Sequence, residues 1–247
     1  MRFHLKNLSR GLTTVVLCLG ACAAQAQALP TPEQVKYVKQ CAPASATTAE
    51  LDKLSRKAAK ETQSYFGAVE VPLSVKLVAH RLIQASPLLS SRWDSVNALD
   101  LRGYEHRQIH AQLNGVSGVM VSSALWKASP ALDPHEQAAV LAHELAHLEA
   151  QDLQLWGCFA QSRLYPDLMS FADAMDFVVT GNDPIVRQFL HELEGVTDKR
   201  ARQLLESAGF DPSALDRVLS RPDLLSAEPS FTHPGSRERI QAAKPQS

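Results

Sequence analysis

Residues 143–147 read H-E-x-x-H, and this pentapeptide constrains the chain more than any other feature of its sequence. Residues four apart on an α-helix face the same way, so the imidazoles of His143 and His147 can reach one ion if the segment is helical. Glu144 follows the first histidine, where its carboxylate can act on a water molecule next to that ion. This spacing is typical of zinc peptidases and predicts a metal site. The alternative is a pair of partly buried structural histidines.

The residues around the motif predict a helix with one buried face. Asp133 suits an N-cap, Pro134 suits the first helical position, and Glu136 completes a capping box. Apolar residues then follow at helical spacing, namely Ala138, Leu141, Ala142, Leu145 and Leu148. We therefore expect both histidines to lie on a helix that packs against the core.

The first 26 residues are typical of an export signal. Positive charge precedes an apolar run from Leu12 to Cys22 that is too short to span a bilayer, and residues 24–26 form an A-x-A cleavage site. The residues ending at Cys22 also resemble a bacterial lipobox. We expect a periplasmic protein cleaved after Ala26, and the alternative is an outer-membrane lipoprotein anchored at Cys22.

Either cleavage leaves Cys41 and Cys158 as the cysteines of the mature chain. In an oxidising compartment we expect them to form a disulfide, with two unpaired thiols as the alternative. The net charge of −1 gives no sign of a nucleic-acid partner or of a polybasic membrane surface. The expected membrane contact is therefore limited to the alternative lipid anchor at Cys22.

The remaining patterns predict an α+β fold that is mostly helical and has a small antiparallel sheet. Helices are expected at about 33–40, 48–65, 72–85, 167–179 and 184–208, with a shorter one after Asp211-Pro212. Strands are expected at 93–101 and in a hairpin, where Asn114-Gly115 separates the alternating segment 109–113 from the valine-rich segment 116–122.

A catalytic zinc ion usually has three protein ligands and an open position, so two histidines are not enough. The predicted helix 184–208 offers His191, Glu192 and Glu194, and spacing alone does not choose among them. Glu194 and Asp198 are four residues apart and share a helix face, where the second carboxylate can accept a hydrogen bond from a ligand histidine. An isolated pair of this kind is more often a solvated helix face.

Four sequence blocks together resemble metallopeptidase family forty-eight, a gluzincin family that includes HtpX, the CAAX prenyl endoprotease and exported bacterial relatives such as BepA and LoiP. The blocks occur in the family's order over residues 73–242. They are Asn97-Ala98, the V-L-A-H-E-x-x-H stretch at 140–147, the E-x-x-x-D and L-L-x-x-A-G-F-D-P stretches within 194–212, and Thr232-His233-Pro234 with Arg239-Ile240. We see neither the tetratricopeptide repeats of some exported relatives nor the multiple membrane spans of HtpX.

The resemblance implies a zincin-type metallopeptidase domain over residues 71–247, preceded by a helical extension over 27–70. Carried over position by position, His143, His147 and Glu194 would bind one Zn²⁺ ion. Glu144 would be the general base.

The resemblance also assigns residues around the metal. Asp198 would orient a ligand histidine. His233 would lie near the metal, where it either steadies the tetrahedral intermediate or occupies the open position in a latent enzyme. The chain departs from the family's usual pattern at Thr197, where relatives have alanine, and at Ser122-Ser123, where they often have glycine. The segment 104–118 is also longer than the family minimum.

These features imply a zinc-dependent endopeptidase of the cell envelope that hydrolyses peptide bonds in proteins, in quality control of misfolded envelope proteins. Its partners would be protein or peptide substrates, with no nucleic acid. The substrate is expected to lie extended along the sheet edge near Val116–Val121, by strand addition. The alternative is a latent enzyme or a non-catalytic, chaperone-like zinc-binding module.

Overall fold

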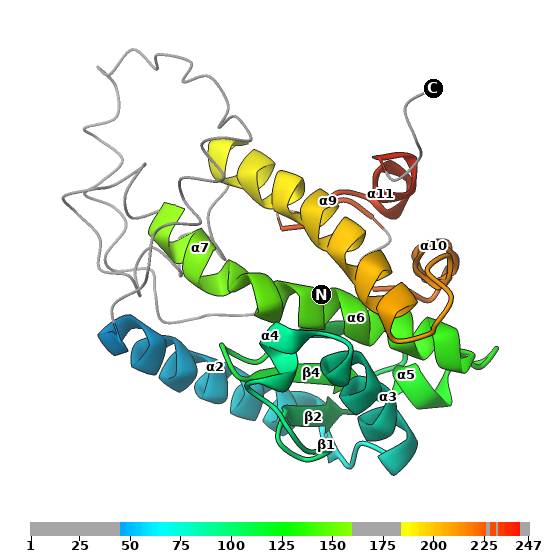
Figure 1. Ribbon diagram of the computed structural model, residues 1–247, viewed down its shortest axis with the longest axis horizontal. Coiled ribbons are helices and arrows are strands. Elements are labelled where there is room, and N and C mark those ends of the chain that lie inside the picture. The colour runs from blue at the N-terminus through cyan, green and yellow to red at the C-terminus, as the bar shows by residue number, and fades with distance from the viewer. Residues whose placement is uncertain (1–44, 160–183, 226–227, 231, 243–247) are drawn as a thin grey trace.

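The computed structural model describes residues 45–159, 184–225, 228–230 and 232–242 (Figure 1). The expected signal peptide with Cys22, the residue Cys41 and the helices expected at 33–40 and 167–179 lie outside these residues, as does the side chain of Cys158. None of the described helices combines the length and the apolar character that crossing a bilayer requires.

The elements in chain order are α2 (Ser45–Phe66), β1 (Ala68–Val69), α3 (Leu73–Gln84), α4 (Pro87–Ser90), β2 (Asp100–Tyr104), β3 (Ala111–Leu113), β4 (Gly118–Ser122), α5 (Ala124–Lys127), α6 (Pro134–Ala150), α7 (Asp152–Phe159), α9 (Pro184–Ser207), α10 (Ala214–Leu219) and α11 (Ser236–Ala242).

Helix α6, which carries the H-E-x-x-H motif, begins and ends at defined signals. The predicted capping box is present: the Asp133 carboxylate accepts a hydrogen bond from the Glu136 N–H at 2.8 Å, and the Glu136 carboxylate accepts one from the Asp133 N–H at 3.0 Å. At the other end Gln151 adopts a left-handed conformation with φ of 57°. This residue turns the chain directly into α7, which begins at Asp152.

Helix α6 is also the centre of the fold. It lies between the sheet on one side and α9 on the other, and α3 and α10 pack against it as well (Figure 1). The sequence predicts one buried face, but every residue from Ala138 to Leu148 is buried. The small side chains of four alanines in this stretch, at positions 138, 139, 142 and 146, leave room for neighbouring elements on all sides. The polar residues of the motif are therefore enclosed by protein.

The sheet has four strands in the order β1-β2-β4-β3. The predicted hairpin is confirmed, because β3 and β4 pair antiparallel with Ala111 opposite Val121, and Gly115 in the turn has φ of 74°. Strand β1 pairs antiparallel with β2, whereas β2 and β4 pair in parallel. The expectation of an antiparallel sheet is thus wrong for the central pair. After β2 the chain first forms the edge strand β3 and then returns between the two, so β4 runs in the direction of β2.

The strand expected at 93–101 is wrong in position, because β2 begins only at Asp100 and the residues before it form turns and bends. Trp93 and Leu99 are buried all the same, so the apolar residues that suggested a strand belong to an irregular part of the core. The helices expected at 48–65, 72–85 and 184–208 are confirmed as α2, α3 and α9. The fold is therefore the predicted mostly helical α+β type, with a mixed sheet.

Candidate metal centre

Three buried side chains from two helices meet at one point. His143 and His147 lie one turn apart on α6, and Glu194 approaches from α9. The Nε2 atoms of the two histidines are 3.2 Å apart, and the Glu194 carboxylate oxygens lie 3.3 Å and 3.2 Å from them. One ligand atom from each residue can be chosen so that all three lie within 4.8 Å of one another, as a metal ion requires.

The structure also separates the three candidates that spacing left open on α9. His191 contacts the carbonyl oxygen of Ser230 through Nε2 at 3.0 Å, and Glu192 is exposed. Glu194 is the candidate that reaches the histidines, and it is only 1% exposed.

The donor set fits a metal ion. The Nδ1 atom of each histidine lies within 3.0 Å of a carboxylate oxygen, so both Nε2 lone pairs are turned toward the same space. Glu194 Oε2 is buried and has no hydrogen-bond partner among the described residues. Two imidazole nitrogens and one carboxylate with an accessible side are the donor set of catalytic zinc sites. A cation at this point would satisfy all three groups at once.

Asp198 orients the first histidine. Its Oδ1 lies 3.0 Å from His143 Nδ1, and the buried guanidinium of Arg239 donates to both of its oxygens, at 2.9 and 2.5 Å. Burial raises the pKa of Asp198, but the hydrogen bonds from Arg239 and His143 outweigh it and hold the pKa well below its ordinary value. The structure thus places Asp198 where the resemblance expects a carboxylate behind a ligand histidine.

Asp152 plays the same part for the second histidine, and the sequence reasoning missed it. Its Oδ2 lies 2.7 Å from His147 Nδ1, and the Thr197 hydroxyl donates to the same oxygen at 3.2 Å. All three residues are buried. The turn at Gln151 brings Asp152 back to the end of α6, five residues after His147. The sequence does contain one signal for Asp152, because it is an acidic residue that follows the end of the helix carrying the H-E-x-x-H motif.

The charges of the group favour a cation. Burial raises the pKa of Glu194, but His233 and the two ligand histidines outweigh it, so the pKa lies well below its ordinary value. Burial lowers the pKa of His147, but Glu194 and Asp152 outweigh it and raise the pKa well above its ordinary value. When both histidines are neutral, as metal ligands must be, Asp152, Glu194 and Asp198 are buried with Arg239 as the neighbouring cation, and a positive ion would compensate this excess of negative charge.

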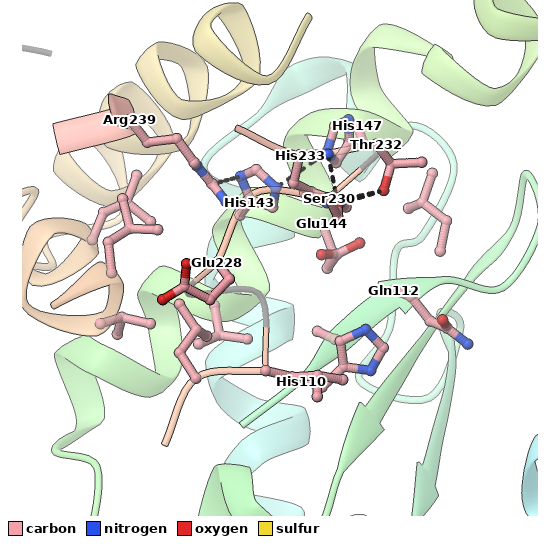
Figure 2. A pocket seen from close by; sticks show the side chains of 18 of the residues that line it. His110, Gln112, His143, Glu144, His147, Glu228, Ser230, Thr232, His233 and Arg239 are labelled. Atoms are coloured by element: carbon pink, nitrogen blue, oxygen red, sulfur yellow. Dashed lines mark hydrogen bonds between the residues drawn. The ribbon is translucent and has the colours of Figure 1, made fainter. Parts of the chain in front are cut away.

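Glu144 stays outside the ligand group and lines a cavity of about 460 Å³ beside it (Figure 2). Burial raises the pKa of this carboxyl group, although both neighbouring histidines lower it. The other walls of the cavity come from residues 110–113, from α10 and from the segment that contains Ser230, Thr232 and His233. A carboxylate next to the metal ligands thus faces a space that can hold a substrate.

His233 also reaches the ligand group. Its Nε2 lies 3.5 Å from Glu194 Oε1, and its Nδ1 lies 2.7 Å from the Thr232 hydroxyl. Burial lowers the pKa of His233 to about 4, so the ring is neutral at pH 7. The resemblance allows two roles for His233: it steadies the tetrahedral intermediate, or it occupies the open metal position in a latent enzyme. Either role requires the ring to lie next to the metal ligands, as it does here.

The sheet edge at the cavity is β3. Residues 111–113 line the cavity, and β4 is paired on both sides, with β2 and with β3. The expectation that the free edge lies near Val116–Val121 is therefore wrong, because the second strand of the hairpin is inside the sheet and the first is at its edge.

The comparison with known families agrees with this geometry. The sequence model of Peptidase family M48 matches residues 103–246, which include all the residues of the site. A comparison with curated proteins found no match. The matched range covers more than half of the chain, and the ligand group that could hold a metal ion lies within it. The chain therefore belongs to peptidase family M48, a family of metal-dependent peptidases.

Proposed function

We propose that this chain is a zinc-dependent endopeptidase that cleaves proteins in the cell envelope. The observation that carries the proposal is the division of roles within one helix. His143 and His147 belong to the ligand group with Glu194, whereas Glu144 lies outside that group and lines the same cavity as the two histidines. A metal site with a purely structural role needs no free carboxylate at that point. Two histidines and one carboxylate match the ligands of catalytic zinc.

The residues of the chain provide a complete set of roles for hydrolysis. When bound, zinc would polarise the scissile carbonyl group and lower the pKa of a water molecule. Glu144 would take the proton from the attacking water and deliver it to the leaving amine, and its raised pKa suits both transfers. Asp198 and Asp152 would hold the two imidazoles with Nε2 toward the metal.

The free edge of β3 supports an extended substrate. The carbonyl of His110 accepts a hydrogen bond from the Ser122 N–H, and the N–H of Asn114 donates to the Gly118 carbonyl. Because backbone groups alternate in direction along a strand, those of Ala111 and Leu113 face away from β4. A substrate strand can pair with these groups up to Ala111, where the free edge ends, because Ile109 is already hydrogen-bonded to Asp223 and Leu225.

The predicted export signal supports a place in the envelope, and the proposed strand addition supports a role in quality control. A peptide can pair with β3 only when it is extended and unprotected, which is true of misfolded proteins and seldom of folded ones. We therefore propose misfolded envelope proteins as the substrate class.

The test compares the mature, zinc-loaded protein with the Glu144→Gln variant on an unfolded protein substrate. We expect the variant to bind zinc normally and to lose activity by about 10²- to 10⁴-fold, the usual contribution of a general base. A wild-type protein that cleaves no faster than the variant would refute the proposal. A latent enzyme would instead become active after His233→Ala.

A further inference from the structure

His110 is a cavity residue that the mechanism above leaves without a role. It lies directly before the edge strand β3, and its ring lines the cavity together with Glu144 and His233. In Figure 2 the ring lies on the β3 side of the cavity, below the Glu144 carboxylate in that view. It belongs to none of the four sequence blocks that resemble the family.

The backbone of His110 is held by Ser122, one of the two serines that depart from the family's usual pattern. The Ser122 hydroxyl accepts a hydrogen bond from the His110 N–H at 3.0 Å, and the Ser122 N–H donates to the His110 carbonyl at 2.8 Å. The same hydroxyl donates to the Gln108 carbonyl at 2.9 Å. Ser122 is fully buried. The segment before β3 therefore has a fixed path, and the ring starts from a fixed Cα position.

Tyr104 fixes the ring itself. Its hydroxyl is in hydrogen-bond contact with His110 Nδ1, and the two rings pack edge to face with centroids 6.2 Å apart. Tyr104 is 3% exposed, so its O–H needs an acceptor, and His110 Nδ1 is the one that the described residues supply. Tyr104 therefore donates, and the proton of the imidazole is on Nε2.

The resulting Nε2–H is a neutral donor in the cavity. Burial lowers the pKa of His110 to about 4, so the ring carries no charge at pH 7. Within the part of the chain that the structure describes, no group accepts a hydrogen bond from Nε2. The donor is thus oriented in advance and has no partner inside the protein.

A peptide on the β3 edge would supply that partner. The backbone groups of Ala111, the next residue, face the free edge, which ends at Ile109 because that residue is hydrogen-bonded to Asp223 and Leu225. A substrate strand paired with Ala111 therefore lies at the end of the free edge, next to His110. Negative charge develops on the scissile carbonyl oxygen during hydrolysis, and a fixed N–H donor stabilises it without reorganisation. We propose that His110 donates a hydrogen bond from Nε2 to this carbonyl oxygen of the substrate, with Tyr104 as its positioning residue. This assignment rests on the proposed peptidase function.

The activity test uses four variants of the zinc-loaded protein. We expect His110→Ala to lower kcat by about 10²-fold with little change in KM, as the loss of one such donor does. His110→Gln restores part of the rate, because its amide can donate from a similar position. Tyr104→Phe causes a smaller loss, because the ring then has no fixed orientation. Arg107→Ala is the matched control: Arg107 lies on the same segment, is exposed and does not line the cavity, so kcat stays near the wild-type value.

A binding test separates this assignment from the proposed function. The probe is a phosphonamidate peptide, whose tetrahedral, negatively charged phosphorus group mimics the charged carbonyl oxygen of the transition state. We expect His110→Ala to weaken its binding by at least tenfold and to leave zinc affinity unchanged. Equal binding by wild type and His110→Ala overturns the role of His110. A parallel loss of zinc affinity also overturns it. Absence of cleavage by the wild type, with the difference in binding intact, overturns the peptidase function and not the hydrogen bond.

Discussion

The two ligand histidines have unequal supports at the residue scale. Asp198, behind His143, receives two hydrogen bonds from Arg239, whereas Asp152, behind His147, receives one from the Thr197 hydroxyl. Thr197 is 3% exposed and stands where the family usually has alanine. The departure from the family pattern thus has a structural use, because the added hydroxyl holds the carboxylate that orients His147.

We predict that Thr197→Val weakens zinc binding by about tenfold, the lower end of the effect of removing an outer-shell partner. Valine keeps the shape of the side chain but cannot donate to Asp152. Thr197→Ser keeps the hydroxyl and should bind zinc like the wild type. Competition with a chromophoric chelator measures both affinities. Equal affinity for valine and threonine would mean that Asp152 is held without this hydroxyl.

The sequence predicts residues of the site only where their positions follow from local spacing. His143 and His147 share a helix face whatever the rest of the fold does, whereas Glu194 had two rivals until the family resemblance chose it. Helical spacing alone predicts neither Asp152 nor His110. The first depends on a turn at the helix end, and the second on which strand of the hairpin lies at the sheet edge.

At the scale of elements, too, the sequence predicts what depends on neighbouring residues and not what depends on residues far apart in the chain. The capping box at Asp133 and the turn at Asn114-Gly115 are signals between neighbouring residues, and both are present in the structure. The parallel pairing of β2 with β4 joins residues 18 apart, such as Asp100 and Gly118, and no local pattern specifies it. The segment that begins at Trp93 is predicted as a strand because of its apolar residues. Apolar residues indicate burial, but they do not distinguish a strand from buried irregular backbone.

The start of α6 offers a test of how firmly the motif helix is fixed. We predict that Asp133→Ala destabilises the protein by about 1 kcal/mol, because the Glu136 N–H loses its acceptor. Asp133→Asn is the matched control, since asparagine caps as well as aspartate but lacks the charge that faces Arg217 at 3.6 Å. The midpoints of denaturant unfolding measure the stability of both variants relative to the wild type. Equal losses in the two variants would assign the effect to the ion pair with Arg217.

At the scale of the whole molecule, the metal site joins three helices. The ligands come from α6 and α9, and Arg239 of α11 bonds to Asp198 of α9. We predict that zinc at about 100 times its Kd stabilises the fold by about 2.7 kcal/mol. For a chain of this size the corresponding rise in Tm is roughly 5–10 °C. A chelator should reverse the rise, and Glu194→Ala should abolish most of it. A full rise in that variant would exclude Glu194 as a ligand.

The pH dependence of this stabilisation follows from His147. In the metal-free protein its pKa is raised, so the protonated ring contributes stability that is present below about pH 6.5 and is lost as the pH rises through the raised pKa. Zinc binds only the neutral imidazole, so protons compete with the metal at low pH. Both effects make the zinc-induced rise in Tm larger at pH 8 than at pH 6, at equal and subsaturating zinc. Thermal unfolding with and without chelator measures the difference at each pH. An equal rise at both pH values would show that His147 does not exchange a proton for the metal.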